Sequence, residues 1–382
     1  MLSKRVLNLK ESGTLKAMIK AKELQAKGMK VIQLDVGEPD FPTPINIIKA
    51  AEKAMEEGFT HYTPSLGIPE LREAIANKLR EENKIDVSKD NIIVTPGSKQ
   101  AIFYAVMALI DEGDEVIIPT PAWSSYMEIV TLAGGKVKEV PTNNDFSLNI
   151  EKIKEAITKR TKLIIINSPN NPTGHVMDIK EIKALCDIVL DSNLFVLSDE
   201  IYEKLVYEGK HISIASLPNM EERTITINGF SKTYAMTGWR LGYAVAPKNI
   251  ISAMNKIQQH TATCVTSFAQ IAAIEALKPH TPIAPMIEEF KRRRDYICKA
   301  LEKLSFKFVK PKGAFYVFPE IPIDNMNSNE FCDILLEKYG VSVTPGTAFG
   351  NYDKHIRISY ANSIENIEEA MKRIEMFINE KR

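Results

Sequence analysis

The chain has 382 residues, 44 % of them hydrophobic, which is enough for a substantial core and for two or three domains of about 150 residues each. Its 49 Lys and Arg residues balance 49 Asp and Glu residues. This zero net charge argues against a nucleic-acid partner, which usually leaves a basic surplus. The strongest basic run, Lys291-Arg292-Arg293-Arg294, falls within a helical pattern and is expected to form a solvated helix face.

The spacing of the cysteines and the length of the apolar runs argue against a disulfide-bonded, metal-binding, secreted or membrane-spanning protein. The four cysteines are scattered, form no C-x-x-C pair and are typical of free thiols in a reducing compartment. No Cys/His cluster has metal-ligand spacing. No signal-peptide core and no apolar run of membrane-spanning length occurs. The sequence therefore predicts a cytoplasmic protein that binds no metal and no membrane.

Strand and helix patterns alternate through the middle of the chain, with helices at 98–111 and 179–190 among them. Such alternation predicts an α/β fold with a mostly parallel seven-stranded sheet and helices on both faces. Functional groups gather at the carboxyl ends of the strands in such sheets. The strands are expected at 91–95, 115–118, 136–140, 162–167, 194–198, 224–228 and 242–246.

The two ends of the chain have a different pattern, which predicts an α+β unit. We therefore expect a large domain at 46–280 and a smaller, discontinuous domain formed by 1–45 and 281–382. Its expected elements are a helix at 15–27, a long helix after 279, strands at 306–309 and 315–318, a helix at 329–339, a strand at 356–360 and a final helix from 363.

The most informative segment is SKTYAMTGWR at 231–240, just after the strand expected at 224–228. A lysine at the end of a strand, with Ser231 beside it and Arg240 eight residues later, suits a Schiff-base lysine next to a phosphate clamp. Lys232 would then commit the protein to pyridoxal 5′-phosphate (PLP) and to carbanion chemistry on amino acids. For a lysine taken alone, a solvated surface loop is the ordinary alternative.

Asp199 follows the buried strand at 194–198. A desolvated carboxylate needs a partner, and the protonated pyridine nitrogen of PLP would be one. A helix N-cap is the alternative role. Tyr202 shares the face of Asp199 if the chain turns helical, and Asn171 lies in a stiff turn after the strand at 162–167. Both side chains are candidates for hydrogen bonds to the O3′ of the ring.

Three more segments complete the candidate site. Gly97-Ser98-Lys99 is a strand–turn–helix junction whose free N–H groups would bind a phosphate together with Ser231 and Arg240. Trp123 lies in the loop after the strand at 115–118 and would stack on a cofactor ring or anchor its loop. Arg357 lies within an alternating strand and would either face solvent or bind a substrate carboxylate.

In this order the segments resemble the fold-type I PLP enzymes, specifically the class I aminotransferases and their aspartate-aminotransferase-like branch. The likeness extends over almost the whole chain, and the ordered set of motifs is very specific. It rests on Gly37-Glu38-Pro39-Asp40-Phe41, Tyr62 with Gly67-Ile68-Pro69-Glu70-Leu71-Arg72, Gly97-Ser98-Lys99-Gln100-Ala101, Trp123, Ser168–Gly174, Asp199–Tyr202, Ser231–Arg240, Gly313-Ala314-Phe315-Tyr316 and Arg357.

The resemblance implies a role for each cofactor-facing residue. Lys232 would bond to PLP and transfer the substrate proton, and Asp199 would hold the pyridinium. Tyr202 and Asn171 would bind the O3′, and Trp123 would stack on the ring. The phosphate would be held by the amides of Gly97–Lys99 and by Ser231 and Arg240.

The resemblance also implies how substrate and a second subunit take part. Arg357 and Asn171 would bind the substrate α-carboxylate, with the Gly37 backbone and Trp123 alongside. Tyr62 would reach the phosphate of the neighbouring subunit, so the active unit would be a homodimer with shared active sites. The small domain would close on the substrate.

The expected activity is therefore a ping-pong transfer of an amino group from an L-amino acid to a 2-oxo acid, with aspartate and 2-oxoglutarate as the first expectation. A broader aromatic or aliphatic range is the next expectation, because Met107 stands where a lysine would suit a distal carboxylate. Ser12 and Thr14 are hydroxyls expected near that carboxylate. A PLP-dependent C–S lyase and a non-catalytic effector domain of a transcription regulator are the alternatives.

Overall fold

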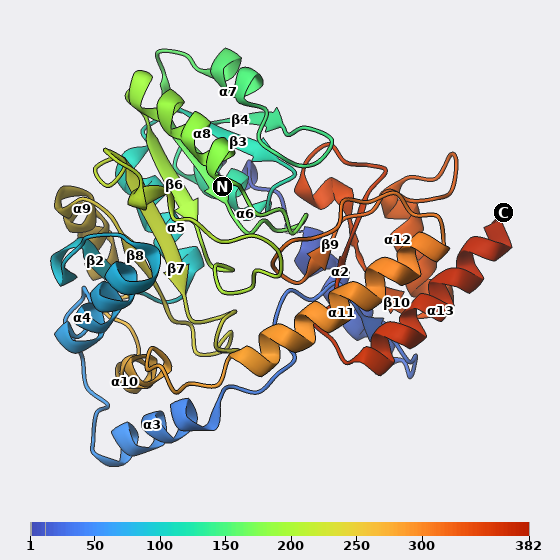
Figure 1. Ribbon diagram of the computed structural model, residues 1–382, viewed down its shortest axis with the longest axis horizontal. Coiled ribbons are helices and arrows are strands. Elements are labelled where there is room, and N and C mark those ends of the chain that lie inside the picture. The colour runs from blue at the N-terminus through green and yellow to red at the C-terminus, as the bar shows by residue number, and fades with distance from the viewer. Residues whose placement is uncertain (1, 12, 382) are drawn as a thin grey trace.

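The computed structural model describes residues 2–11 and 13–381, leaving aside the side chains of residues 14 and 15 (Figure 1). A seven-stranded sheet with the order β2-β8-β7-β6-β5-β3-β4 forms its larger part. β8 is antiparallel to both neighbours, and all other neighbouring pairs are parallel. The strands are β2 (Ile92–Thr95), β3 (Glu115–Thr120), β4 (Lys136–Pro141), β5 (Thr161–Asn167), β6 (Phe195–Asp199), β7 (Thr224–Gly229) and β8 (Gly242–Val245).

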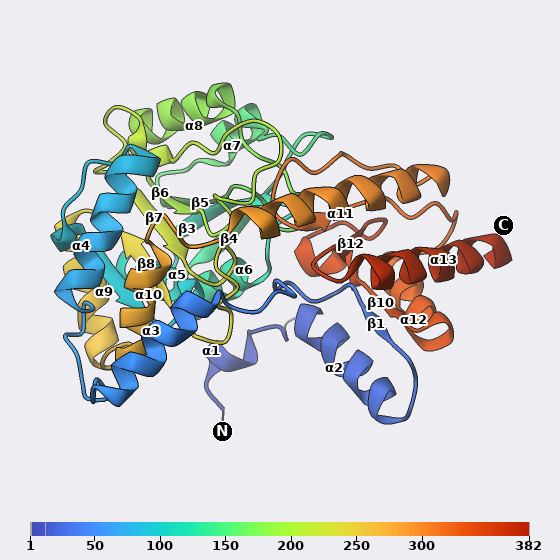
Figure 2. The ribbon, with the colours of Figure 1, turned by 60° about the horizontal axis from the view of Figure 1, so that its bottom comes forward.

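This sheet confirms the predicted fold class, and each expected strand ends within two residues of an observed one. Along β3, Val116 and Ile118 pack in one apolar cluster and Ile117 in another. Alternating side chains of a strand point to opposite faces, so both faces of this sheet are covered. Figures 1 and 2 show α5 and α9 against one face and α7 and α8 against the other.

The helices around this sheet include several that the sequence patterns did not single out, namely α3, α4, α6, α7, α9 and α10. Those before residue 280 are α1 (Lys4–Leu7), α2 (Gly13–Ala26), α3 (Ile45–Glu56), α4 (Pro69–Lys78), α5 (Ser98–Leu109), α6 (Ser125–Leu132), α7 (Ile150–Ala156), α8 (Ile179–Asp191), α9 (Lys248–Gln259) and α10 (Ser267–Ala276). Short turns of helix lie at η1 (Leu79–Asn83), η2 (Lys89–Asn91) and η3 (Ile214–Ser216). No helix in the described ranges is long and apolar enough to span a bilayer.

The smaller part of the molecule combines an N-terminal segment with the C-terminal elements, and α2 lies beside those elements (Figure 2). β1 (Ile32–Gln33) pairs in parallel with β10 (Val341–Ser342), and a second, antiparallel sheet has the order β11-β12-β9. The boundaries of two domains stay a prediction. The remaining elements are α11 (Ala284–Lys303), β9 (Tyr316–Val317), α12 (Ser328–Tyr339), β11 (Thr344–Pro345), η4 (Gly346–Phe349), β12 (Ile356–Ser359) and α13 (Ile364–Lys381).

The strand expected at 306–309 is wrong. Only Lys307 pairs, in a single bridge to Glu320. Pro319 and Pro322 flank that partner, and proline has no N–H to donate to a ladder, so the pairing does not extend.

The prediction that Lys291–Arg294 forms a solvated helix face is also wrong for two of the four residues, Arg293 and Arg294. Arg293 and Arg294 are 5 % and 1 % exposed on α11. Arg293 pairs with Asp40 at 2.7 Å, and Arg294 pairs with Glu208 at 2.8 Å and donates to the Pro311 carbonyl at 3.0 Å. The two arginines are buried because α11 packs against acidic loops that a helical pattern alone does not reveal.

Arg294→Ala is expected to lower the free energy of unfolding by about 1–3 kcal/mol, because the buried Pro311 carbonyl loses its donor. Glu208 and Asp295 are partly solvated, which limits the loss from the ion pairs. Arg292→Ala, on the exposed side of the same helix, is the matched control and should leave stability nearly unchanged. Urea unfolding of the two variants measures the difference, and equal losses would contradict the prediction.

Candidate active site

A cavity of about 290 Å³ opens at the carboxyl ends of the central strands. Of the residues proposed to bind the cofactor or the substrate α-carboxylate, it brings together all but two, although they come from segments spread between residues 37 and 357. The two outside its lining are Gly97 and Tyr62. A larger cleft of about 580 Å³ lies between α2, α6 and α12, but none of the predicted site residues whose side chains the structure describes lines it.

Lys232 lies in the cavity just beyond β7, and its Nζ donates to the Gly37 carbonyl at 2.5 Å. Desolvation lowers the pKa of this amine to about 8, against the effect of Glu38 and with the help of the cations Arg357 and Arg240. A substantial fraction of the amine is therefore neutral near physiological pH. This state is what nucleophilic and proton-transfer chemistry requires.

Asp199 ends β6 and is 3 % exposed. Burial raises the pKa of its carboxyl to about 6, although Tyr126 and Ile201 stabilise the charged form. Tyr126 donates to Oδ2 at 2.6 Å, and the Ile201 N–H donates to Oδ1 at 3.2 Å. The second bond resembles the N-cap alternative, yet the carboxylate also lines the cavity. It suits a cationic partner, which would complete its charge balance.

Tyr202 is buried three residues beyond Asp199 and also lines the cavity. Its hydroxyl lies 2.9 Å from the hydroxyl of Tyr316. Burial raises the pKa of both phenols, so both stay protonated at neutral pH and have O–H groups to donate.

The solvent-facing alternative for Arg357 is wrong, because this residue is only 3 % exposed. Its guanidinium donates to Asn171 Oδ1 at 3.1 Å, to the Asp35 carbonyl, and to Thr344 Oγ1 at 3.3 Å. Its Nε–H is buried without a hydrogen-bond partner among the described residues. A rigidly held cation with a donor left over is well suited to bind a carboxylate.

The junction before α5 has the shape of an anion cradle. Gly97 has a φ of +87°, and a Cβ at this position would collide with the Arg240 guanidinium. The Ser98 hydroxyl donates to the Asn228 carbonyl at 2.9 Å, which ties the start of α5 to the end of β7. The first N–H groups of the helix have no carbonyl within it. With Ser231 and Arg240 close by, the residues present fit a phosphate.

Trp123 and Lys99 stand at the side of the cavity, with the Lys99 ammonium 4.5 Å from the centre of the Trp123 ring. Trp123 meets Tyr126 edge to face at 5.4 Å. Trp123 is half-buried and lines the same cavity as Asp199 and Lys232, which fits an aromatic cofactor. Together with the phosphate cradle, these groups make the cavity fit PLP, and the unpaired Arg357 donor is left for a substrate carboxylate.

Some expected residues lie elsewhere. Tyr62 is 88 % exposed and does not reach the cavity of its own chain. Met107 is 38 % exposed on α5 and also lies outside the cavity. Ser12 and the side chain of Thr14 lie outside the described residues.

Tyr126 and Tyr316 also line the cavity, but they were not predicted as site residues from the sequence. Tyr316 belongs to a motif quoted for the resemblance, but neither tyrosine was given a role. A signal existed for Tyr126, because it follows Trp123 by only three residues at the start of α6.

Comparisons with known proteins decide the family. The sequence profile described as "Aminotransferase class I and II" matches residues 29–374. The chain belongs to the class I and II aminotransferases. It is therefore a PLP-dependent aminotransferase, acting on amino acids and 2-oxo acids, and the predicted enzyme class and cofactor are confirmed.

Several relatives in this family are similar along nearly their whole length. The aspartate aminotransferase of Pyrococcus abyssi is 48 % identical over 366 residues, which cover 94 % of each chain. Aromatic-amino-acid aminotransferase 2 of Thermococcus litoralis is 44 % identical over 360 residues, or 92 % of each chain. The structure of aspartate aminotransferase from Thermus thermophilus with maleate superposes with a TM-score of 0.93, at 42 % identity and 98 % coverage of both chains.

Proposed function

We propose that this aminotransferase uses aspartate as amino donor and 2-oxoglutarate as acceptor, with Lys232 as the residue that bonds the cofactor. The observation that carries the proposal is the meeting of Lys232, Asp199 and Arg357 in one cavity. These three groups are an amine with a lowered pKa, a buried carboxylate and a buried guanidinium.

Each side chain has a task that follows from its chemistry. Bound PLP supplies a ring that accepts electrons from the substrate carbon. Asp199, fixed by Tyr126, would hold the ring nitrogen in its protonated form, and the neutral Lys232 amine would accept the proton from the substrate Cα. Arg357 and Asn171 hold the substrate carboxylate and so fix which bond faces the ring.

The charges that line the cavity support an anionic donor. Four cations face it, Lys99, Lys232, Arg240 and Arg357, against the carboxyl groups of Asp35 and Asp199. A positive cavity attracts a dicarboxylate as well as a phosphate. The naming of several relatives as aspartate aminotransferases supports the same donor.

An aromatic amino acid is the second candidate donor. Met18, Ile102 and Trp123 give the cavity an apolar side. The relative from Thermococcus litoralis is named an aromatic-amino-acid aminotransferase.

We also propose that the active unit is a homodimer in the cytoplasm. Tyr62 exposes 88 % of its surface on a protomer, which suits a side chain that completes the phosphate site of a second copy. The four cysteines are free, which suits a reducing compartment. The proposed domains, 46–280 and 1–45 with 281–382, would close over the substrate.

A panel of amino donors tests the proposal. Protein loaded with PLP is mixed with aspartate, glutamate, tyrosine or phenylalanine in the absence of acceptor, and the half-reaction is followed by cofactor absorbance. Aspartate should give the highest second-order rate constant and release oxaloacetate, and glutamate should form when 2-oxoglutarate is then added. Higher rates with tyrosine and phenylalanine would favour the second candidate. Release of pyruvate and ammonia from cystathionine without acceptor would indicate a lyase instead.

A further inference from the structure

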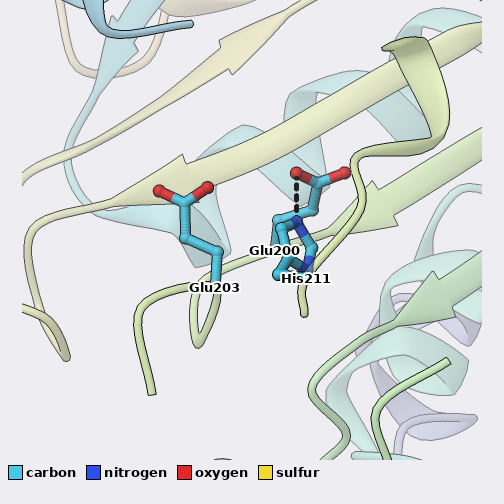
Figure 3. Close-up of side chains that lie close together, drawn as sticks. All are labelled: Glu200, Glu203 and His211. Carbon is cyan, nitrogen blue, oxygen red and sulfur yellow. Dashed lines mark hydrogen bonds and ion pairs between the residues drawn. The ribbon is translucent and has the colours of Figure 1, made fainter. Parts of the chain in front are cut away.

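The turn that follows β6 has two faces with different surroundings. Asp199 and Tyr202 face the cavity. Glu200 and Glu203 point to the other side, where they lie close to His211 (Figure 3). The backbone holds the turn together, since the Glu203 N–H donates to the Glu200 carbonyl at 2.9 Å. Any movement of the two glutamates would therefore move the two cavity residues.

Glu203 is held by groups from α4 and η1. Lys78, at the end of α4, forms a close ion pair with Oε1 of Glu203 and donates to Asn83 Oδ1 at 2.7 Å. Asn83 donates to Oε2 of Glu203 at 2.6 Å and to the Ser213 hydroxyl at 2.8 Å. The side chains of Lys78 and Glu203 are each 7 % exposed, so this pair is buried.

Glu200 is held from the strand below it and from the segment around residue 211. The Ser198 hydroxyl donates to Oε1 at 2.9 Å. The Ser213 hydroxyl donates to Oε2 at 2.6 Å, and His211 Nε2 lies 2.9 Å from the same oxygen. All four carboxylate oxygens of the two glutamates thus have partners.

The three side chains in Figure 3 lie within 4.8 Å of one another through atoms that could bind a metal ion. Lys78 already supplies a cation at this place, and hydrogen bonds occupy each oxygen. The arrangement is therefore an ion-pair network, which we call the Lys78 network: Lys78, Asn83, Glu200, Glu203, His211 and Ser213.

The charges of the Lys78 network balance when His211 is protonated. Burial lowers the pKa of His211, but Glu200 and Glu203 outweigh it and raise the pKa above its usual value. Burial would raise the pKa of Glu203, but Lys78 and His211 lower it to about 2. The other titratable groups facing the network are Glu82, Tyr234 and Tyr243. The turn thus carries no unpaired charge behind Asp199.

We propose that the Lys78 network positions the turn so that the Asp199 carboxylate and the Tyr202 phenol are held in place for the cofactor. Its members are positioning residues, because they act through Asp199 and Tyr202 and line no part of the cavity. The inference rests on the proposed function, which makes those two residues cofactor ligands.

The double variant Lys78→Met with Glu203→Gln tests the proposal, because it removes both charges of the buried pair and leaves neither alone. Two quantities are measured: hydrogen exchange of the backbone amides of residues 201–205 in PLP-free protein, and the dissociation constant of PLP by absorbance titration. We expect faster exchange and a dissociation constant raised by about 10–100-fold, the loss that removing the hydrogen-bond partners of metal ligands typically causes. The single variant Lys78→Arg, which keeps the positive charge, should bind PLP nearly as tightly as the wild type does.

The double variant Lys154→Met with Glu151→Gln is the matched control, since this pair is 3.3 Å apart and exposed on α7. It should change neither quantity. If the Lys78 double variant fails to fold, His211→Gln is measured instead, with a smaller change in the same direction expected.

Wild-type exchange and wild-type PLP affinity in the buried-pair variant would overturn the proposal. Faster exchange with unchanged PLP affinity would overturn it too, because the network would then serve stability alone. Failure of the wild-type protein to bind PLP is a different result, which contradicts the proposed function itself.

Discussion

Replacing Lys232 with alanine is expected to remove turnover and the long-wavelength absorbance of the bound cofactor together. The side chain is the amine in the cavity with a pKa lowered to about 8, so it can both bond the cofactor and carry a proton. Loss of its proton transfer alone should reduce the rate by about 10²–10⁴-fold. Turnover with aspartate and 2-oxoglutarate and the visible spectrum are the measurements.

Lys248→Ala is a suitable control for this variant, because its amine lies at the surface in an exposed pair with Asp90. It should keep both the absorbance and the rate. A Lys232→Ala protein that retains turnover would show that another group bonds the cofactor. Loss of absorbance with retained activity would likewise contradict the assignment.

The sequence predicts the central sheet well because its signals are local. Val116, Ile117 and Ile118 are all apolar, as a strand covered on both faces requires, and Asp199 marks the end of such a strand. Strand ends of a parallel sheet meet at one edge, so the segments after them could be expected to form the site. That reasoning predicted that Lys232, Asp199 and Trp123 share one site, and all three line the same cavity in the structure.

Partners of these residues could not be predicted, because they depend on how distant elements pack. Tyr126 reaches Asp199 across 73 positions of sequence. The alternation in β12 suggested a solvated Arg357, yet all four residues of the strand are buried. A period of two does not separate inside from outside when both faces of a small sheet are covered. The α9 helix could have been predicted from Ile250, Ile251 and Met254, which recur with helical spacing.

Asp199→Asn is expected to have opposite effects on catalysis and on the stability of the PLP-free protein. Asparagine can accept the Ile201 N–H bond through its single oxygen and donate its amide N–H to the Tyr126 hydroxyl, but it carries no charge to hold a protonated ring. Removing such a preorganised charge typically reduces kcat by about 10²–10³-fold. Turnover of the loaded variant measures this loss.

The stability effect follows from the raised pKa of the same carboxyl. Burial takes the pKa from its ordinary value of 3.8 to about 6 in the folded, PLP-free protein. Between these values the folded chain keeps a proton that the unfolded chain releases. The free energy of unfolding therefore falls as pH rises through this window, by up to about 3 kcal/mol.

Asparagine does not ionise, so the PLP-free Asp199→Asn protein should lose this pH dependence and be more stable than wild type at pH 7. Urea unfolding of both proteins from pH 4 to pH 8 measures the effect, with Asp191→Asn at the exposed end of α8 as the control. A variant that is less stable than wild type at pH 7 would contradict the argument. The charged Asp199 carboxylate is unfavourable for folding when PLP is absent. The cationic ring of bound PLP would stabilise this charge.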